Sequence, residues 1–471
     1  MKNVRTRFAP SPTGIMHIGN IRTALLNYIF AQQSNGSCIL RIEDTDPKRN
    51  FDPGAKKIQE HLSWLGLNFQ EGPAQDGPHN PYFQSQRNDI YKKHLQTLQD
   101  NDFVYRCFCT QEELEAKRQR QIAMKKPPRY DGTCANLSQE AIQDKIADNK
   151  PFVWRMKVDN NKQISFQDLA RGTLNFDLKN FSDFPLTRED GSFTFMFANC
   201  VDDFEMNITH VLRGEDHLTN TVGQVVLLQA FNKEIPVFWH LAILCNQTGK
   251  KLSKRDQGFS LEDLKQAGFL PEAICNYLGI IGGSFEQEIL TLKELVNAYN
   301  FENISSTSQI KYDIEKLRWI NHKWIAQYSP EALAQLCKPY IAEQYDISST
   351  SDETLTCLIK AIQTDLHTLQ ESADLLNFYF NKPNITTEAL QKTISSDKAQ
   401  DLLKILGQEQ QDWGSFTAHI KQQAKAKNIS NKELFSSIRL LLTGSPQGIQ
   451  IQDLFNCLGK EEFFARLSIS L

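Results

Sequence analysis

The sequence predicts an α/β part built on a parallel sheet, followed by an all-α C-terminal part. Two sets of apolar runs, each with the order strand, helix, strand, predict the sheet. They cover residues 3–8, 21–31 and 38–42, and later residues 208–212, 221–231 and 237–244. From about residue 310 the apolar spacing becomes helical, with little of the alternation that strands show.

The length of 471 residues is too great for one compact core and favours several domains. Because the two sets of strands are far apart in the sequence, we expect the sheet to form in two halves with an insertion between them. The predicted segments are residues 1–100, the first half; 101–190, the insertion; 191–310, the second half; and 311–471, the helical domain.

Composition excludes a membrane protein. No apolar run approaches the roughly 20 residues that span a bilayer, and the N-terminus starts without a signal or transit segment. We expect a cytoplasmic protein and a monomer. The net charge of −4 does not favour polyanions, but residues 117–129 carry six positive charges and no negative ones. This stretch is either a solvated helix face or a phosphate contact.

The segment RFAPSPTGIMHIGN, residues 7–20, joins the first strand to the first helix. Ligands of such sheets bind beyond the strand ends, where a helix N-terminus supplies unpaired N–H groups. Prolines stiffen this loop, Gly14 allows a sharp turn, and His17 could donate to a phosphate. Taken alone, a histidine here is more often a structural residue.

The segment GKKLSKRDQG, residues 249–258, places four cations after a strand of the second half. A basic loop at that end of the sheet could cover a triphosphate and offset its charge. Such a loop by itself is usually solvated surface, but together with the first loop it becomes specific.

The two loops resemble the HIGH and KMSKS signatures of class I aminoacyl-tRNA synthetases, here HIGN and KLSKR. Four more stretches are similar to bacterial glutamyl-tRNA synthetases: RIEDTD (41–46), LRGEDH (212–217), LPEAICNYLGIIG (270–282) and LGKEEFFARL (458–467). The resemblance implies a Rossmann-like catalytic domain with an inserted acceptor-binding subdomain and an all-α anticodon-binding domain. It further implies a ligase that activates L-glutamate with ATP, releasing diphosphate, and transfers it to the 3′ end of tRNA(Glu).

The resemblance also implies an ATP site. His17 and Lys254 would be catalytic and hold the phosphates, Gly19 would leave room for the adenosine, and Mg²⁺ would neutralise phosphate oxygens. The other implied ATP-binding positions are Thr13, Gly14, Asn20, Asp216, His217, Ile243, Leu244, Lys251 and Ser253.

For the substrate, two carboxylates and one ammonium require cations and an anion. By the resemblance, Arg7 and Arg213 bind carboxylates and Glu43 binds the ammonium. Which arginine takes the side-chain carboxylate stays open, and an Arg7–Glu43 ion pair is the alternative role. The other implied contacts are Ala9, Ser11, Asn199 and Phe195, the last where the family usually has tyrosine.

Three cysteines stand close in sequence: Cys107 and Cys109 in YRCFC, and Cys134 in YDGTC. They resemble the zinc knuckle of some glutamyl-tRNA synthetases, in which a histidine often stands where this chain has Asn136. Tyr130 is then the substitute fourth ligand for a structural Zn²⁺. Three reduced cysteines without metal are an equally good reading.

The RNA contacts are less defined. Residues 311–325 resemble the junction to the anticodon-binding part, and residues 420–432 add several lysines that could contact phosphate. Whether the enzyme charges only tRNA(Glu) or also tRNA(Gln) stays open.

Four other classes of protein fit the sequence less well. A glutaminyl-tRNA synthetase would have a β-barrel anticodon part, and the short tRNA-modifying paralogue would lack the helical domain. An inactive RNA-binding relative disagrees with the intact cations and Glu43. A nicotinamide-dependent dehydrogenase would need a G-x-G-x-x-G after the first strand.

Overall fold

The computed structural model describes residues 3–14, 16–46, 48, 50–253, 256, 258, 260–301, 307–406 and 412–467. The chain divides into two compact units: residues 1–262 with 275–314, and residues 263–274 with 315–471. The predicted four-segment division stays a prediction.

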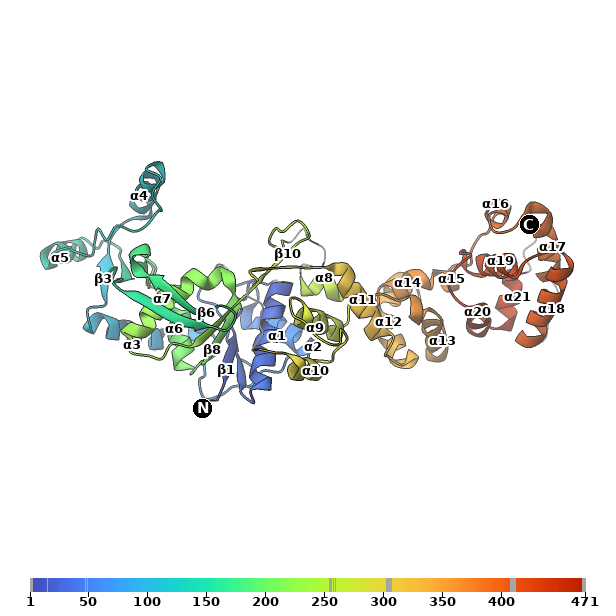
Figure 1. The fold of residues 1–471 in the computed structure, drawn as a ribbon, viewed down its shortest axis with the longest axis horizontal. Helices are drawn as coiled ribbons and strands as arrows, with labels where there is room; N and C mark the ends of the chain where they lie inside the picture. Colours follow the sequence, from blue (N-terminus) through green and yellow to red (C-terminus); the bar gives the residue numbers. More distant parts are fainter. Residues whose placement is uncertain are drawn as a thin grey trace. The chain divides into compact units, whose positions relative to one another are not determined.

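The first unit holds the parallel sheet. Strand β1 (Arg5–Phe8) pairs in parallel with β2 (Ser37–Leu40), and β8 (His210–Gly214) pairs in parallel with β9 (Val237–Leu241). The backbone of Arg5 accepts a hydrogen bond from Thr209 N–H at 3.0 Å, which brings the start of β1 beside β8. In Figure 1 the two strands lie next to each other, with α1 (Ile18–Gln33) alongside. Two sets of strands far apart in sequence therefore adjoin, as predicted.

Helix α1 is fixed to both halves of the sheet by buried polar contacts. The Thr6 hydroxyl donates to the carbonyl of Asn27 at 3.0 Å, and the Asn27 amide donates to the carbonyl of Leu212 at 3.1 Å. Since the carboxyl ends of parallel strands meet at one edge, the loops after β1 and β8 open on the same side.

A β-hairpin extends the second half of the sheet. Strands β5 (Gln163–Asp168) and β6 (Gly172–Asp177) pair antiparallel, and β5 joins β9 in parallel where Asp168 faces Phe238. The strand order is therefore β6-β5-β9-β8. A strand from the predicted insertion thus joins the second half of the parallel sheet directly.

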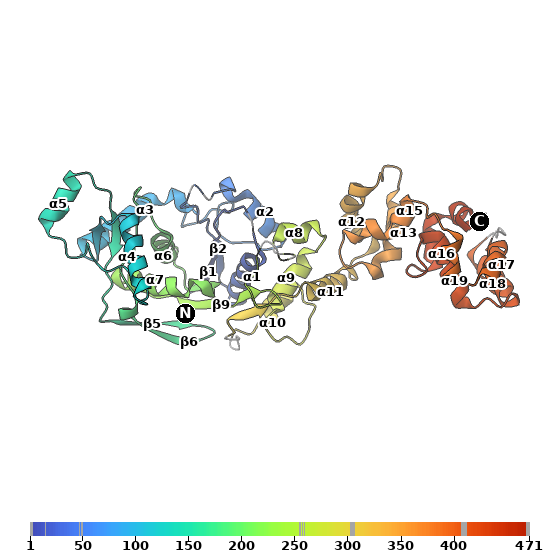
Figure 2. The same ribbon diagram turned by 90° about the horizontal axis from the view of Figure 1, so that it is seen from above.

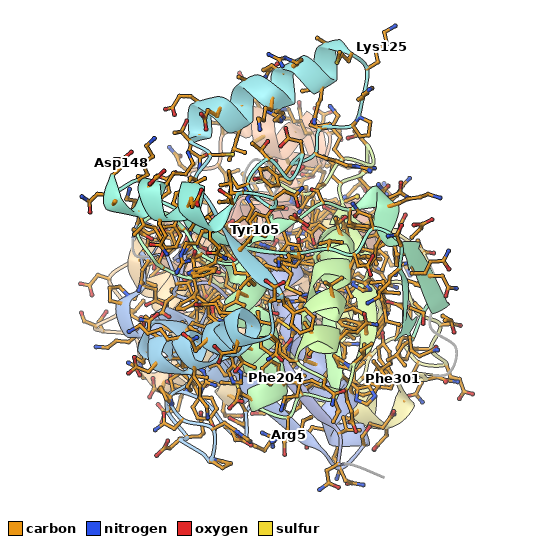
Figure 3. The ribbon with its side chains drawn as sticks, turned by 90° about the vertical axis from the view of Figure 1, so that its left-hand side faces the viewer. Arg5, Tyr105, Lys125, Asp148, Phe204 and Phe301 are labelled. Carbon is orange, nitrogen blue, oxygen red and sulfur yellow. The ribbon has the colours of Figure 1, made fainter. Side chains whose placement is uncertain are left out.

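The rest of the insertion forms a smaller antiparallel sheet, β3-β4-β7, with two exposed helices. Its elements are β3 (Val104–Cys107), α4 (Gln111–Ala123), α5 (Gln139–Ala147), β4 (Val153–Met156) and β7 (Phe184–Pro185). Figure 3 shows Lys125, just after α4, at the opposite end of the first unit from Arg5. Three of the six cations of residues 117–129 lie on the exposed helix α4, and the other three follow it.

The remaining elements of the first unit surround these sheets, as Figures 1 and 2 show. They are α2 (Lys56–Trp64), α3 (Asn88–Asp100), α6 (Phe195–Glu205), α7 (Leu218–Ala230), β10 (Ile243–Cys245), α10 (Leu292–Ala298) and β11 (Gln309–Lys311). The predicted strand 237–244 is two strands, because β9 pairs with β8 while β10 pairs with β11. The chain passes between the two units within α8 (Leu261–Gln266) and α9 (Pro271–Ile280).

The second unit is helical throughout its described part, which confirms the predicted all-α C-terminal domain. Its apolar side chains, such as Leu333, Ile359, Phe416 and Leu434, are buried between helices. The helices are α11 (Ile314–Ile325), α12 (Pro330–Gln344), α13 (Asp352–Ile362), α14 (Glu371–Leu375), α15 (Asn377–Phe380), α16 (Thr387–Gln391), α17 (Ser396–Leu406), α18 (Trp413–Ala426), α19 (Asn431–Thr443), α20 (Ile451–Leu458) and α21 (Lys460–Leu467). Among the helices of the described residues, none has the length and apolarity to cross a membrane.

Candidate active site

A cavity of about 440 Å³ opens in the first unit beyond the carboxyl ends of β1 and β8. It brings together most of the residues singled out in the sequence. Those lining it are Arg7, Ala9, Ser11, Thr13, Gly14, His17, Gly19, Asn20, Glu43, Phe195, Asn199, Arg213, Asp216, His217, Ile243, Leu244 and Lys251. Ser253 does not line it, and Lys254 lies outside the described residues.

His17 ends the loop after β1 and is the N-cap of α1. Its Nδ1 accepts a hydrogen bond from the backbone N–H of Asn20 at 3.3 Å. Because Nδ1 is the acceptor, the neutral ring carries its proton on Nε2. Burial lowers the pKa of His17, the Lys251 ammonium lowers it further, and Asp216 opposes both. The ring is therefore a neutral N–H donor at the cavity wall.

Gly19 is required by this arrangement. A Cβ on residue 19 would lie 3.0 Å from Nδ1 and 3.1 Å from Cε1 of His17. Contacts that short would push the imidazole from its place over the first turn of α1, so the sequence H-x-G has a steric reason at this helix start.

The first half of the basic loop folds back onto β10. The Leu252 N–H donates to the carbonyl of Leu244 at 3.2 Å, which places the side chain of Lys251 at the cavity. The Lys251 Nζ lies 2.9 Å from Oδ2 of Asp216 in a solvent-exposed salt bridge. A cation from residues 249–258 thus shares a cavity with the imidazole of His17.

Arg7 and Glu43 do not form the ion pair considered from the sequence; each is held by a different buried partner. Arg7 donates from Nε and Nη2 to the carboxylate of Asp203, at 3.1 and 3.4 Å. Arg41 donates to Asp203 at 2.7 Å and to Glu43 at 3.1 Å. Burial acts to raise the pKa of Asp203, but Arg7 and Arg41 hold that pKa below its ordinary value. Burial raises the pKa of Glu43 against the same two cations.

Arg213 differs from Arg7 because it forms no salt bridge with a carboxylate of the described residues. Its Nη2 donates to the Thr221 hydroxyl at 2.7 Å and to the Gln224 side-chain oxygen at 2.5 Å. Among the described residues, its Nε and Nη1 have no hydrogen-bond partner. Burial lowers the pKa of Arg213 to about 9. A buried guanidinium with two unused donors at a cavity wall favours an anionic ligand.

A chain of amide groups connects Arg213 to Glu43. The Gln224 amide donates to the Asn199 side-chain oxygen at 2.7 Å, and the Asn199 amide donates to the carboxylate of Glu43. The orientation of both amides is thereby set, because each accepts on its oxygen and donates from its nitrogen. Gln224 accepts from Arg213 and donates to Asn199, which donates to Glu43. The guanidinium of Arg213 and the carboxylate of Glu43 are therefore held by a single continuous hydrogen-bonded network.

Phe195, the position at which the family usually has tyrosine, lies at the cavity wall beside His217. Their ring centroids are 5.6 Å apart with planes tilted by 42°. Burial, followed by the charge of Arg213, lowers the pKa of His217 to about 4. The ring pair supplies an apolar wall and a neutral imidazole.

Four network residues were not singled out in the sequence: Arg41, Asp203, Thr221 and Gln224. Arg41 belongs to the quoted RIEDTD stretch, and Asp203 is one of three acids within a largely apolar helix. Polar residues in buried helices indicate an internal network, so this signal was present in α6 and α7. Their partners cannot be assigned without the tertiary structure.

The three cysteines of the insertion also come together. The sulfur atoms of Cys107, Cys109 and Cys134 lie within 4.8 Å of one another. The Tyr130 hydroxyl lies 3.3 Å from the Cys107 sulfur, 3.9 Å from the Cys109 sulfur and 3.0 Å from the Cys134 N–H. Three thiols this close together are a ligand set that could hold Zn²⁺, and the phenol oxygen of Tyr130 lies beside them.

Comparison with known proteins places both parts of the chain. The family "tRNA synthetases class I (E and Q), catalytic domain" matches residues 3–319, and "Anticodon binding domain" matches residues 332–471. The fold and the cavity of the first unit thus define a class I aminoacyl-tRNA synthetase.

The relatives specify the family further. The glutamate–tRNA ligases of Bacillus velezensis and Bacillus subtilis are each 35% identical over 477 residues, covering 98% of this chain and 99% of theirs. A crystal structure of a glutamate tRNA ligase from Elizabethkingia meningosepticum, in complex with its amino acid, superposes with a TM-score of 0.88 at 31% identity, covering 99% of this chain and 98% of that one. The chain belongs to the glutamate–tRNA ligase family.

Proposed function

We propose that the cavity binds L-glutamate and ATP side by side and joins them as glutamyl-adenylate. The observation that carries this proposal is the pairing, in one cavity, of the unneutralised Arg213 with the phosphate-binding elements His17 and Lys251. An amino acid with two carboxylates fits the first, and a triphosphate fits the second.

The part of the cavity that binds glutamate would select this amino acid by its charges. Arg213 donates from Nε or Nη1 to one carboxylate, Arg7 attracts the other, and Glu43 binds the ammonium. A neutral amide in place of the side-chain carboxylate would leave a buried arginine unneutralised, which disfavours glutamine as the amino acid. Ala9, Ser11 and Asn199 complete the wall.

The ATP end would act through position and charge rather than covalent chemistry. The Nε2–H of His17 and the ammonium of Lys251 donate to phosphate oxygens, and Asp216, His217, Ile243 and Leu244 line the adenosine site. A carboxylate oxygen of glutamate attacks the α-phosphorus, and the bond to diphosphate breaks. Mg²⁺ bound with ATP would neutralise phosphate charge. The catalytic role proposed for Lys254 rests on the family resemblance alone.

The second step would transfer the glutamyl group to tRNA(Glu). A ribose hydroxyl at the 3′ end attacks the activated carbonyl, and AMP leaves. The helical second unit would bind the anticodon, while the exposed cations of residues 117–129 suit the phosphates of the acceptor end. The cytoplasm, which supplies tRNA and keeps cysteines reduced, is the proposed location of this monomeric enzyme.

The cysteine cluster would hold a structural Zn²⁺ through Cys107, Cys109, Cys134 and Tyr130. When bound, the ion would fix β3 and the loop before α5 in the insertion. It would take no part in the reaction of the distant cavity.

Aminoacylation of purified tRNA(Glu) with labelled L-glutamate and ATP tests the proposal. Arg213→Ala should raise the KM for glutamate by at least about tenfold, because a hydrogen-bonded charge contact is lost. Arg5→Ala is the matched control on the same sheet: Arg5 is bound to Glu71 at 2.8 Å outside the cavity, and its loss should leave that KM unchanged. Failure of tRNA(Glu) to accept label, or an unchanged KM in Arg213→Ala, would reject the proposal.

A further inference from the structure

Behind Arg213 lies a hydrogen-bonded chain of three buried side chains that do not line the cavity. The Nδ1 of His240 lies 2.7 Å from Oδ2 of Asp168, and its Nε2 lies 2.7 Å from the hydroxyl of Thr221. The side chains of Asp168 and His240 are fully buried. The chain therefore runs from β5 of the insertion through β9 and α7 to the guanidinium of Arg213.

The direction of each hydrogen bond follows from the groups present. Asp168 accepts from the backbone N–H groups of Ala170, Arg171 and His240, at 3.0 Å each, as a carboxylate should. It then also accepts from Nδ1–H of His240, because a carboxylate has no proton to give. The neutral His240 must therefore present the lone pair of Nε2 to Thr221.

The hydroxyl of Thr221 is oriented by that lone pair. Its oxygen lies 2.7 Å from Nε2 of His240 and 3.3 Å from the carbonyl oxygen of His217, so the nearer imidazole nitrogen is the main acceptor of its proton. The lone pairs of the hydroxyl are then left for the Nη2–H of Arg213. The second Nη2–H goes to Gln224, so both hydrogens of this nitrogen are used. Because the guanidinium is planar, fixing both hydrogens of Nη2 also fixes the directions of the N–H groups on Nη1 and Nε of this cavity-lining residue.

We propose that Asp168 and His240 are positioning residues, which act through Thr221 to hold Arg213 ready for a carboxylate of glutamate. The inference rests on the role of Arg213 in the proposed function. Preorganised donors bind an anion more tightly than donors that must first be ordered, so the chain contributes to glutamate affinity without touching glutamate.

A purely structural role would be different in its effects. A buried Asp–His pair that only joins β5 to β9 would, when removed, lower stability and the fraction of active enzyme. It would leave the KM for glutamate unchanged, because KM does not depend on the active fraction. The KM for ATP supplies an internal reference, since Thr221 lies next to Arg213 and not next to Lys251.

The test compares two substitutions at Thr221 in the full-length enzyme. Thr221→Val keeps the shape and removes the hydroxyl, whereas Thr221→Ser keeps the hydroxyl and removes the methyl group. Aminoacylation of tRNA(Glu) should show the KM for glutamate raised about tenfold in Thr221→Val and restored in Thr221→Ser, with the KM for ATP unchanged in both.

Substitutions of His240 extend the test one bond further. His240→Leu should raise the KM for glutamate as Thr221→Val does, and His240→Gln should recover part of it by offering an acceptor near the place of Nε2. His210→Phe is the matched control: this histidine is on neighbouring β8, bonds the Thr209 hydroxyl at 2.9 Å, and lies outside the cavity. It should leave the KM unchanged.

The outcomes separate this inference from the proposed function. If Arg213→Ala raises the KM for glutamate but Thr221→Val and His240→Leu do not, the positioning chain is rejected and the role of Arg213 stands. If Arg213→Ala itself has no effect, the proposed function fails first. Equal increases in Thr221→Val and Thr221→Ser would also overturn the inference, since the hydroxyl would then not be the cause.

Discussion

Arg41 Nη1 lies 2.7 Å from Asp203 Oδ1, and the side chain of Arg41 has no solvent-exposed surface. Asp203 also accepts from Arg7, so one carboxylate bridges two buried cations beside the cavity. The position of Arg7 at the end of β1 therefore depends on a helix, α6, that follows nearly 200 residues later.

Asp203→Asn should destabilise the first unit strongly. The substitution keeps the shape but removes the charge that Arg7 and Arg41 share, and loss of one member of a buried pair costs about 3 kcal/mol. Urea unfolding of the first unit measures the change. Asp159→Asn is the control, because Asp159 and Lys162 form a surface pair at 3.4 Å, and it should change the free energy of unfolding far less. Equal effects of the two substitutions would contradict the shared-charge role.

Lys251→Ala should weaken ATP binding. The Lys251 ammonium lines the cavity with His17 and is the described cation of the KLSKR segment nearest to that imidazole. We expect the KM for ATP to rise about tenfold, from one lost charge-assisted hydrogen bond, while the KM for glutamate stays the same. Steady-state aminoacylation with varied ATP measures it. A rise confined to the KM for glutamate would show that the two ends of the cavity are assigned wrongly.

Stability should fall on mild acidification, partly because of His217. Its pKa is lowered to about 4 in the folded protein, against an ordinary value of 6.5. Between these pH values the unfolded chain binds a proton here and the folded chain does not, so folding free energy is lost as pH falls from 6.5 to 4. His217→Gln should reduce that pH dependence by about one proton, as measured by urea unfolding at a series of pH values. An unchanged dependence would mean that His217 is not buried as a neutral ring.

Metal analysis tests the cysteine cluster. Purified enzyme should contain about one Zn²⁺ per chain, and Cys134→Ser should lose it because a thiolate ligand is removed. Cys337→Ser, at a buried cysteine of α12 outside the cluster, should retain the metal. Wild-type protein with a zinc content near zero would leave three reduced cysteines as the correct description.

The sequence was sufficient for the architecture and for most residues around the cavity. Periodicity predicted the two strand sets and the helical C-terminal part, whereas His17 and most other residues around the cavity were named from the resemblance to a known family. The supporting residues were not predicted, because Asp203, Thr221 and His240 act through contacts between segments far apart in the chain. Local patterns cannot predict that Glu43 pairs with Arg41 and not with Arg7, since both arginines lie near the end of a predicted strand.

A crystal structure of this enzyme with L-glutamate bound is the most direct test of the central claim. The account predicts one carboxylate of glutamate within hydrogen-bonding distance of Nε or Nη1 of Arg213, and the ammonium beside Glu43. Glutamate bound elsewhere, with both of those nitrogens still lacking a partner, would contradict it.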